Sequence, residues 1–142
     1  MSARRTIVHA TAVSGVGLHL GQPCRLSFEP ATPGRGIVFR RVDLPGSPET
    51  PALVTSAQRA ERRTQLGSGD SALHTVEHVL AAVAGSGIDD VMVCMDGPEP
   101  PILDGSCLPF VEALREAGVV EHGGTVEYLR LRDSVRLVDG AS

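Results

Sequence analysis

The stretch HTVEHVLAAVAGSGIDDVMVCM, residues 74–95, decides the fold. Its first half carries apolar residues three and four positions apart, the spacing of one face of an α-helix: Val76, Val79, Leu80 and Val83. Asp70 or Ser71 can cap that helix, and two glycines end it. The spacing therefore predicts a helix over residues 71–84.

A buried strand and a second helix follow. Ile88–Met95 is a short apolar run, which is typical of a strand buried on both faces. Leu108–Ala117 is predicted to be helical, because Pro109 is tolerated in a first helical turn and Gly118 marks a helix end.

Most of the remaining sequence predicts strands and turns. Around Cys24–Glu29 apolar and polar residues alternate, as in a strand with one buried face. Residues 14–17 are predicted as a turn and residues 43–51, with three prolines, as a loop. The expected strands are Arg5–Ala12, Cys24–Glu29, Gly36–Arg41, Ile88–Met95 and Thr125–Val138, the last as one strand or a hairpin. The fold class that results is α+β, a two-layer sandwich with two helices on one face of a mostly antiparallel sheet.

The composition is that of one globular domain. The 142 residues are 42% hydrophobic but only 3% aromatic, so we expect a core of Val, Leu, Ile and Ala. No stretch approaches the ~18 consecutive apolar residues of a transmembrane helix. The N-terminus lacks a secretory apolar region, and the three cysteines contain no CxxC pair. We therefore expect a cytoplasmic protein with free thiols.

The charge excludes several functions. A net charge of −4 argues against a nucleic-acid partner. All 13 basic residues are arginines. The absence of lysine removes Schiff-base chemistry and a Walker-type phosphate site from consideration.

The segment His74–His78 carries the strongest chemical signal. On a helix, His74 and His78 lie one turn apart and can bind one zinc ion, while Glu77 can take a proton from an activated water. The pattern H-x-x-E-H is that of an inverted zinc-peptidase motif. The alternative is an exposed helix start that carries polar residues.

Two further stretches are candidates for the site. Residues 14–21, SGVGLHLG, place three glycines around His19, as expected if the backbone turns tightly to present Leu18 and His19. Residues 98–106, PEPPILDGS, form a stiff loop that brings Asp104 to the start of the second helix. Asp104 or Ser106 can either cap that helix or take part in catalysis, and the sequence leaves both roles open.

Four ordered motifs resemble the UDP-3-O-acyl-N-acetylglucosamine deacetylase family, the zinc-dependent amidohydrolases of lipid A biosynthesis. They are SGVGLHLG, RRTQLG, TVEHVLAAVAGSGIDD and PEPPILDGSCLPFVEAL, and the resemblance extends from Arg5 to about Asp139. It implies hydrolysis of the N-acetyl group of UDP-3-O-(3-hydroxyacyl)-N-acetylglucosamine, with Zn²⁺ as cofactor and this UDP-linked acylated glucosamine as the small-molecule partner.

The resemblance also implies roles for individual residues. Glu77 is expected to be the general base and His78 a zinc ligand, with His74 a bystander. Leu18 and His19 are expected at the substrate rim. Asp104, Gly105 and Ser106 are expected to give structural support.

The family's chain is about twice as long and folds as two similar α+β domains that face each other across the active site. Residues 1–142 correspond to the first domain, and the second is absent from the sequence. The remaining zinc ligands of the family lie in a His-Lys-x-x-x-Asp segment of that second domain. The last histidine here, His122, has no following aspartate at helical spacing. We therefore expect a truncated or half enzyme, inactive alone, whose partner is a second-domain chain.

Two alternatives stay open. The chain is either a non-catalytic binding domain or complementing half, or a different zinc hydrolase in which His74 and His78 are paired ligands. In the second case Glu99 or Glu121 would provide a third ligand.

Overall fold

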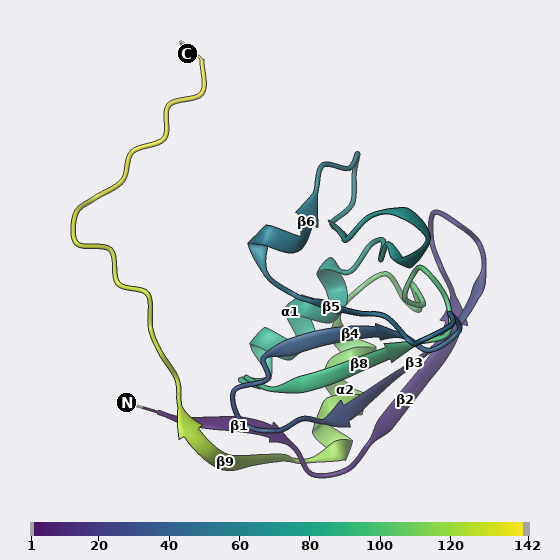
Figure 1. Cartoon of the computed structure of the whole chain (residues 1–142), viewed down its shortest axis with the longest axis horizontal. Helices are drawn as coiled ribbons and strands as arrows, with labels where there is room; N and C mark the ends of the chain where they lie inside the picture. Colours follow the sequence, from purple (N-terminus) through teal and green to yellow (C-terminus); the bar gives the residue numbers. More distant parts are fainter. Residues whose placement is uncertain (1, 141–142) are drawn as a thin grey trace.

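A computed structural model describes residues 2–140, which form a mixed sheet backed by two helices (Figure 1). The five-stranded sheet has the order β2-β3-β8-β4-β5. Its strands are β2 (Thr11–Val16), β3 (Pro23–Pro30), β8 (Val91–Met95), β4 (Ile37–Arg41) and β5 (Glu49–Pro51). The β4–β8 pair is parallel, and the other three pairs are antiparallel. The predicted α+β class with a mostly antiparallel sheet is confirmed.

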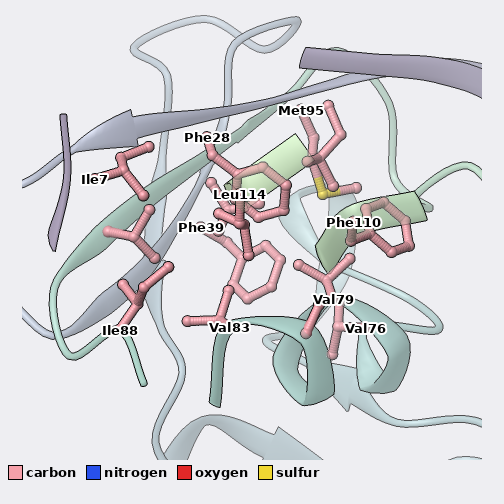
Figure 2. Packing of buried hydrophobic residues seen from close by; sticks show 14 of the residues in the cluster. Ile7, Phe28, Phe39, Val76, Val79, Val83, Ile88, Met95, Phe110 and Leu114 are labelled. Carbon is pink, nitrogen blue, oxygen red and sulfur yellow. The ribbon is translucent and has the colours of Figure 1, made fainter. Parts of the chain in front are cut away.

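Helices α1 (Glu77–Gly85) and α2 (Leu108–Ala117) contact each other and lie on one face of the sheet. The alternating residues of β3 and β8 that face them include Leu26, Phe28 and Val93, each 0% exposed. Because side chains alternate across a strand, a single face of each strand contributes to this core. The helices bury Val79, Val83 and Leu114 against it (Figure 2).

The three phenylalanines of the chain, Phe28, Phe39 and Phe110, all lie at the centre of this core (Figure 2). The rings of Phe28 and Phe110 meet edge to face, with centroids 6.3 Å apart. Such pairs are favourable because the positive edge of one ring meets the negative face of the other. The core is mostly aliphatic, as expected, but the three phenylalanine rings lie at its centre.

Two small sheets complete the described chain. β1 (Ala3–Ile7) pairs antiparallel with β9 (Val119–Thr125), and β6 (Ala57–Gln58) pairs with β7 (Gln65–Leu66). Short 3₁₀ turns lie at Val54–Ser56 and Gly69–Ser71. After β9 the chain runs away from the rest of the domain (Figure 1).

The predicted start of the first helix is wrong. Asp70 and Ser71 lie in a 3₁₀ turn, and α1 begins only at Glu77. Between them Thr75 adopts φ +55°, a left-handed conformation that cannot be part of a right-handed helix. The second helix, by contrast, has the predicted bounds.

Several strand predictions are also corrected. The predicted strand Arg5–Ala12 is two strands, because the backbone N–H groups of Val8 and His9 bond the end of α2 instead of a strand. Of the predicted turn at residues 14–17, residues 14–16 are the end of β2, and the turn follows at residues 18–20. The predicted loop at 43–51 contains β5. The last strand is β9, whereas residues 126–138 contain no strand.

Asp90 joins the β1–β9 pair to the main sheet. Its carboxylate is fully buried and accepts two hydrogen bonds from Arg4, both 2.7 Å, and one from the backbone N–H of Gly36. His122 Nε2 of β9 lies 2.9 Å from the same carboxylate. Burial by itself raises the pKa of Asp90, but these hydrogen bonds lower it by more. The pKa of the Asp90 carboxyl therefore lies well below its usual range.

Within residues 2–140, neither helix has the length and apolar character needed to cross a bilayer.

Replacing Leu114 by alanine should lower the free energy of unfolding by about 2–5 kcal/mol, because Leu114 is fully buried and its loss leaves a cavity. Leu129→Ala is the matched control, since Leu129 is 95% exposed, and should change it by less than about 0.5 kcal/mol. Urea denaturation followed by circular dichroism measures both. Equal effects would contradict the packing described.

Asp90→Asn should lower the unfolding free energy at pH 7 by roughly 1–3 kcal/mol, because Arg4 loses its charged partner. The pKa of Asp90 is lower in the folded state than in the unfolded state. The stability that ionised Asp90 contributes is therefore fully present above its unfolded-state pKa and is lost as the pH falls through its folded-state pKa. The difference between wild type and variant should therefore shrink below about pH 4. A difference that grows with acidification would contradict this account.

Candidate functional site

Segments distant in sequence meet at the N-terminal end of α1. The backbone N–H of Val76 donates to the carbonyl of Thr64 at 3.3 Å, and that of His74 donates to the carbonyl of Pro98 at 2.9 Å. The loop that follows β2 is bonded to Glu99. These bonds bring the sequence motifs around residues 18, 64, 77 and 99 to one end of the molecule.

Glu77 and His78 form the first turn of α1, and both are half-buried. Glu77 Oε2 accepts a hydrogen bond from the backbone N–H of Thr64 at 3.0 Å, which fixes the carboxylate at the helix start. A carboxylate in this position is also favoured by the helix dipole. His78 is not sealed in the core, so its imidazole remains available for a ligand.

His74 lies before α1 rather than on it. The alternative in which His74 and His78 share one helix face conflicts with the structure, because the left-handed residue Thr75 separates His74 from the helix. The His74 Nδ1 atom is buried without a hydrogen-bond partner. Burial, with Arg63 nearby, lowers the pKa of His74, which favours a neutral ring.

Leu18 and His19 lie in the loop between β2 and β3. Leu18 is 57% exposed, and His19 is exposed at the edge of a depression of about 480 Å³. Three consecutive residues, Glu61, Arg62 and Arg63, line the same depression. Two arginines and one glutamate thus line this surface, and the sequence motifs alone assign these arginines no role.

Glu99 is a buried carboxylate that connects two of the site segments. It is 1% exposed, and its oxygens accept hydrogen bonds from the backbone N–H groups of His19, at 3.0 and 3.1 Å, and of Leu20, at 2.8 Å. The hydroxyl of Thr75 donates to Oε1 at 2.7 Å. Burial raises the pKa of Glu99, but the bonds from His19, Leu20 and Thr75 outweigh it and lower the pKa overall.

The glycines of SGVGLHLG are explained partly by a turn and partly by close packing. A Cβ atom at Gly15 would lie 3.0 Å from Pro101 Cβ, and one at Gly17 would lie 2.9 Å from Glu99 Cδ. Of the three glycines in this motif, only Gly21 has a positive φ, of +63°. The predicted tight turn is present at residues 18–20, where the N–H of Gly21 donates to the carbonyl of Gly17 at 3.2 Å. Gly15 and Gly17 have a different explanation, because the 98–103 loop occupies the space where their side chains would be.

Asp104, Gly105 and Ser106 lie immediately before α2. Asp104 Oδ1 accepts hydrogen bonds from the backbone N–H and the hydroxyl of Ser106, at 2.9 and 2.8 Å. Ser106 Oγ in turn accepts the N–H of Leu108, the first residue of α2. Gly105, at φ +82°, allows the turn. These contacts are local and support the start of the helix.

No group of three or more His, Cys, Asp or Glu side chains that could hold a metal ion occurs within residues 2–140. The alternative zinc set with Glu99 conflicts with the structure, because both oxygens of this carboxylate already accept hydrogen bonds. Glu121 lies on β9, where its register partner is Arg5 of β1, and it belongs to no group of metal-binding side chains among the described residues. Glu77 and His78 stay together in the first turn of α1.

Sequence reasoning missed two residues of this region. Thr75 gives no signal, since a positive φ at a β-branched residue is not visible in a sequence. Glu99 was considered only as an alternative metal ligand. Its position in PEPP, where prolines remove conformational freedom around one acidic residue, was the available signal.

A family model matches residues 4–142: LpxC, UDP-3-O-acyl N-acetylglycosamine deacetylase. The chain is 42% identical over 132 residues to a bifunctional enzyme LpxC/FabZ of Chlorobaculum tepidum, covering 93% of this chain and 28% of that protein. It is 41% identical over 140 residues to a UDP-3-O-acyl-N-acetylglucosamine deacetylase of Citrifermentans bemidjiense, covering 99% and 46%. The corresponding protein of Myxococcus xanthus is 44% identical over 137 residues, covering 96% and 44%. The chain therefore spans less than half the length of these curated relatives.

Gly17→Ala should lower the unfolding free energy by about 1–3 kcal/mol, because the added Cβ overlaps Glu99 Oε2, which its hydrogen bonds hold in place. The control is Gly85→Ala, at the end of α1, where an added Cβ meets nothing within 4 Å and should leave stability unchanged or slightly higher. Thermal unfolding of both variants measures this. A neutral Gly17→Ala would refute the close-packing explanation.

Proposed function

The chain belongs to the UDP-3-O-acyl-N-acetylglucosamine deacetylase family, and on this premise we propose that it provides part of the active site of a zinc-dependent deacetylase of lipid A biosynthesis. The observation that carries the proposal is the placement of Glu77 and His78 side by side in the open first turn of α1.

The reaction is hydrolysis of an amide. A water oxygen attacks the N-acetyl carbonyl of UDP-3-O-acyl-N-acetylglucosamine, and the C–N bond breaks. Acetate and the free amine of the glucosamine are the products. A group that accepts the proton of the attacking water is needed, and so are groups that hold the amide in place.

Glu77 is the proposed general base. Its hydrogen bond from the Thr64 N–H engages Oε2 and fixes the side chain, while Oε1 can accept the proton of the attacking water. The partial exposure of Glu77 allows water to reach it. A base must be held within hydrogen-bond reach of the proton it removes, and the Thr64 bond provides that restraint.

His78 is the proposed zinc ligand. A half-buried imidazole next to a carboxylate fits one position of a catalytic zinc site, which uses three protein ligands. Since no complete metal-binding group occurs within residues 2–140, the proposal requires further ligands from outside the described chain. Bound zinc would supply Lewis-acid activation of the amide carbonyl and of the water.

Leu18 and His19 are proposed to contact the substrate at the rim. Leu18 offers exposed apolar surface, and His19 borders the polar depression with Arg62 and Arg63. The UDP-linked substrate in the relatives' names also supports a cytoplasmic protein as part of the proposal.

The test uses this chain fused to the remaining portion of the Myxococcus xanthus relative. Glu77→Gln should lower kcat by about 10²–10⁴-fold with zinc content unchanged, because a general base does not hold the metal. His78→Ala should lose both zinc and turnover. Acetate release and metal analysis measure the two effects.

The control is His74→Ala, which should keep the zinc content of the wild type because His74 lies before α1. Zinc retained by His78→Ala, or lost from His74→Ala, would overturn the ligand assignment. Acetate release by the separate 142-residue chain at the rate of the fusion would contradict the need for outside ligands.

A further inference from the structure

Glu99 is a buried charged group for which the proposed reaction has no use. Its side chain is only 1% exposed and so offers almost no surface to a substrate. A buried carboxylate is costly unless its oxygens are fully hydrogen-bonded. The three donors around Glu99 meet this requirement, and none of them is a side chain of opposite charge.

The donors come from two different parts of the site. The backbone N–H groups of His19 and Leu20 belong to the rim loop, and the hydroxyl of Thr75 belongs to the turn that leads into α1. Glu99 itself directly follows Pro98, whose carbonyl accepts the N–H of His74. One carboxylate therefore holds the rim loop at a fixed position relative to the turn that precedes Glu77 and His78.

We propose that Glu99 is the positioning residue of this site, aligning the loop of Leu18 and His19 with the first turn of α1. The part of the proposal that concerns turnover rests on the proposed deacetylase function. The part that concerns alignment rests on the hydrogen bonds alone.

A carboxylate suits this task better than an amide. All groups that face Glu99 are donors, and an ionised carboxylate only accepts. Glutamine would turn its NH₂ group either toward a backbone N–H, which cannot accept it, or toward the Thr75 hydroxyl, which would then have to accept instead of donate. In both cases the charge that strengthens these bonds is lost. The backbone of Gly17 packs closely against the Glu99 carboxylate, since a Cβ added at Gly17 would overlap Oε2. The Glu99 side chain therefore has no room to move toward Gly17.

Thr75 provides a second, independent observation. It is buried and adopts φ +55°, a conformation that a β-branched residue takes only when its surroundings enforce it. Its hydrogen bond to Glu99 is such a restraint. The strained residue lies two positions before Glu77, so release of Thr75 would change the start of α1.

The alignment is tested with the full 142-residue chain by amide NMR. Glu99→Gln should shift the His19 and Leu20 amide signals upfield and raise their hydrogen-exchange rates roughly tenfold or more, the size expected for the loss of charge-assisted bonds. The amides of Glu77 and His78 should shift as well. Glu116→Gln, the same change at an exposed position of α2, should leave all four signals in place.

A second pair of variants covers the case in which Glu99→Gln does not fold. Thr75→Val keeps the branched shape but removes the hydroxyl, and should shift the Glu77 and His78 amides. Thr75→Ser keeps the hydroxyl and should restore the wild-type positions. Unchanged His19 and Leu20 signals in Glu99→Gln, or equal effects of Thr75→Val and Thr75→Ser, would overturn the alignment.

Turnover is tested in the fusion described above. Glu99→Gln should lower kcat at least tenfold with KM and zinc content changed much less, because the reacting groups are displaced rather than removed. Wild-type kcat in this variant would overturn the link to catalysis. A wild-type fusion without any deacetylation would instead refute the proposed function, and the NMR result would still decide the alignment.

Discussion

Strand β8 is hydrogen-bonded on both edges, to β3 and to β4, and all five of its residues are buried. Its register fixes the segments on either side of it in the sequence. The chain enters β8 from α1, whose first turn holds Glu77 and His78, and leaves it toward Glu99, four residues beyond Met95. The spatial relation between these three residues is therefore set by one central strand, and the hydrogen bond of Glu99 to Thr75 closes that arrangement.

Much of the fold follows from local pattern. The alternation around Cys24–Glu29, the apolar run at Ile88–Met95 and the Pro109–Gly118 punctuation predicted β3, β8 and α2. The start of α1 did not follow, because Val76 has helical spacing but is preceded by a turn held by residues near position 99. Likewise, alternation at residues 126–138 predicts a strand, yet a strand forms only where a neighbouring strand is available for pairing.

The sequence predicted the chemical groups of the candidate site but not the contacts that hold these groups in position. Glu77 and His78 carry the motif, and resemblance to a family assigns them roles that stay predictions. The interactions around them depend on contacts between residues 13 to 80 positions apart, such as those of Glu77 with Thr64 and of Glu99 with His19. A residue pattern contains no direct sign of such contacts. The glycine at position 17, whose Cβ space is taken by Glu99, and the prolines around Glu99 are traces of them in the sequence.

The pairing of β1 with β9 has a consequence for synthesis on the ribosome. Residues 3–7 are synthesised well before their partners, residues 119–125. At about 5–20 residues per second, roughly 6 to 24 s pass before β9 has been made. During that interval β1 presents unpaired backbone N–H and C=O groups, the feature that makes a strand edge prone to association with other chains. Arg4 and Arg5 place positive charge on β1 while it is unpaired. Charged side chains are one of the means by which proteins prevent an exposed strand edge from pairing with another chain.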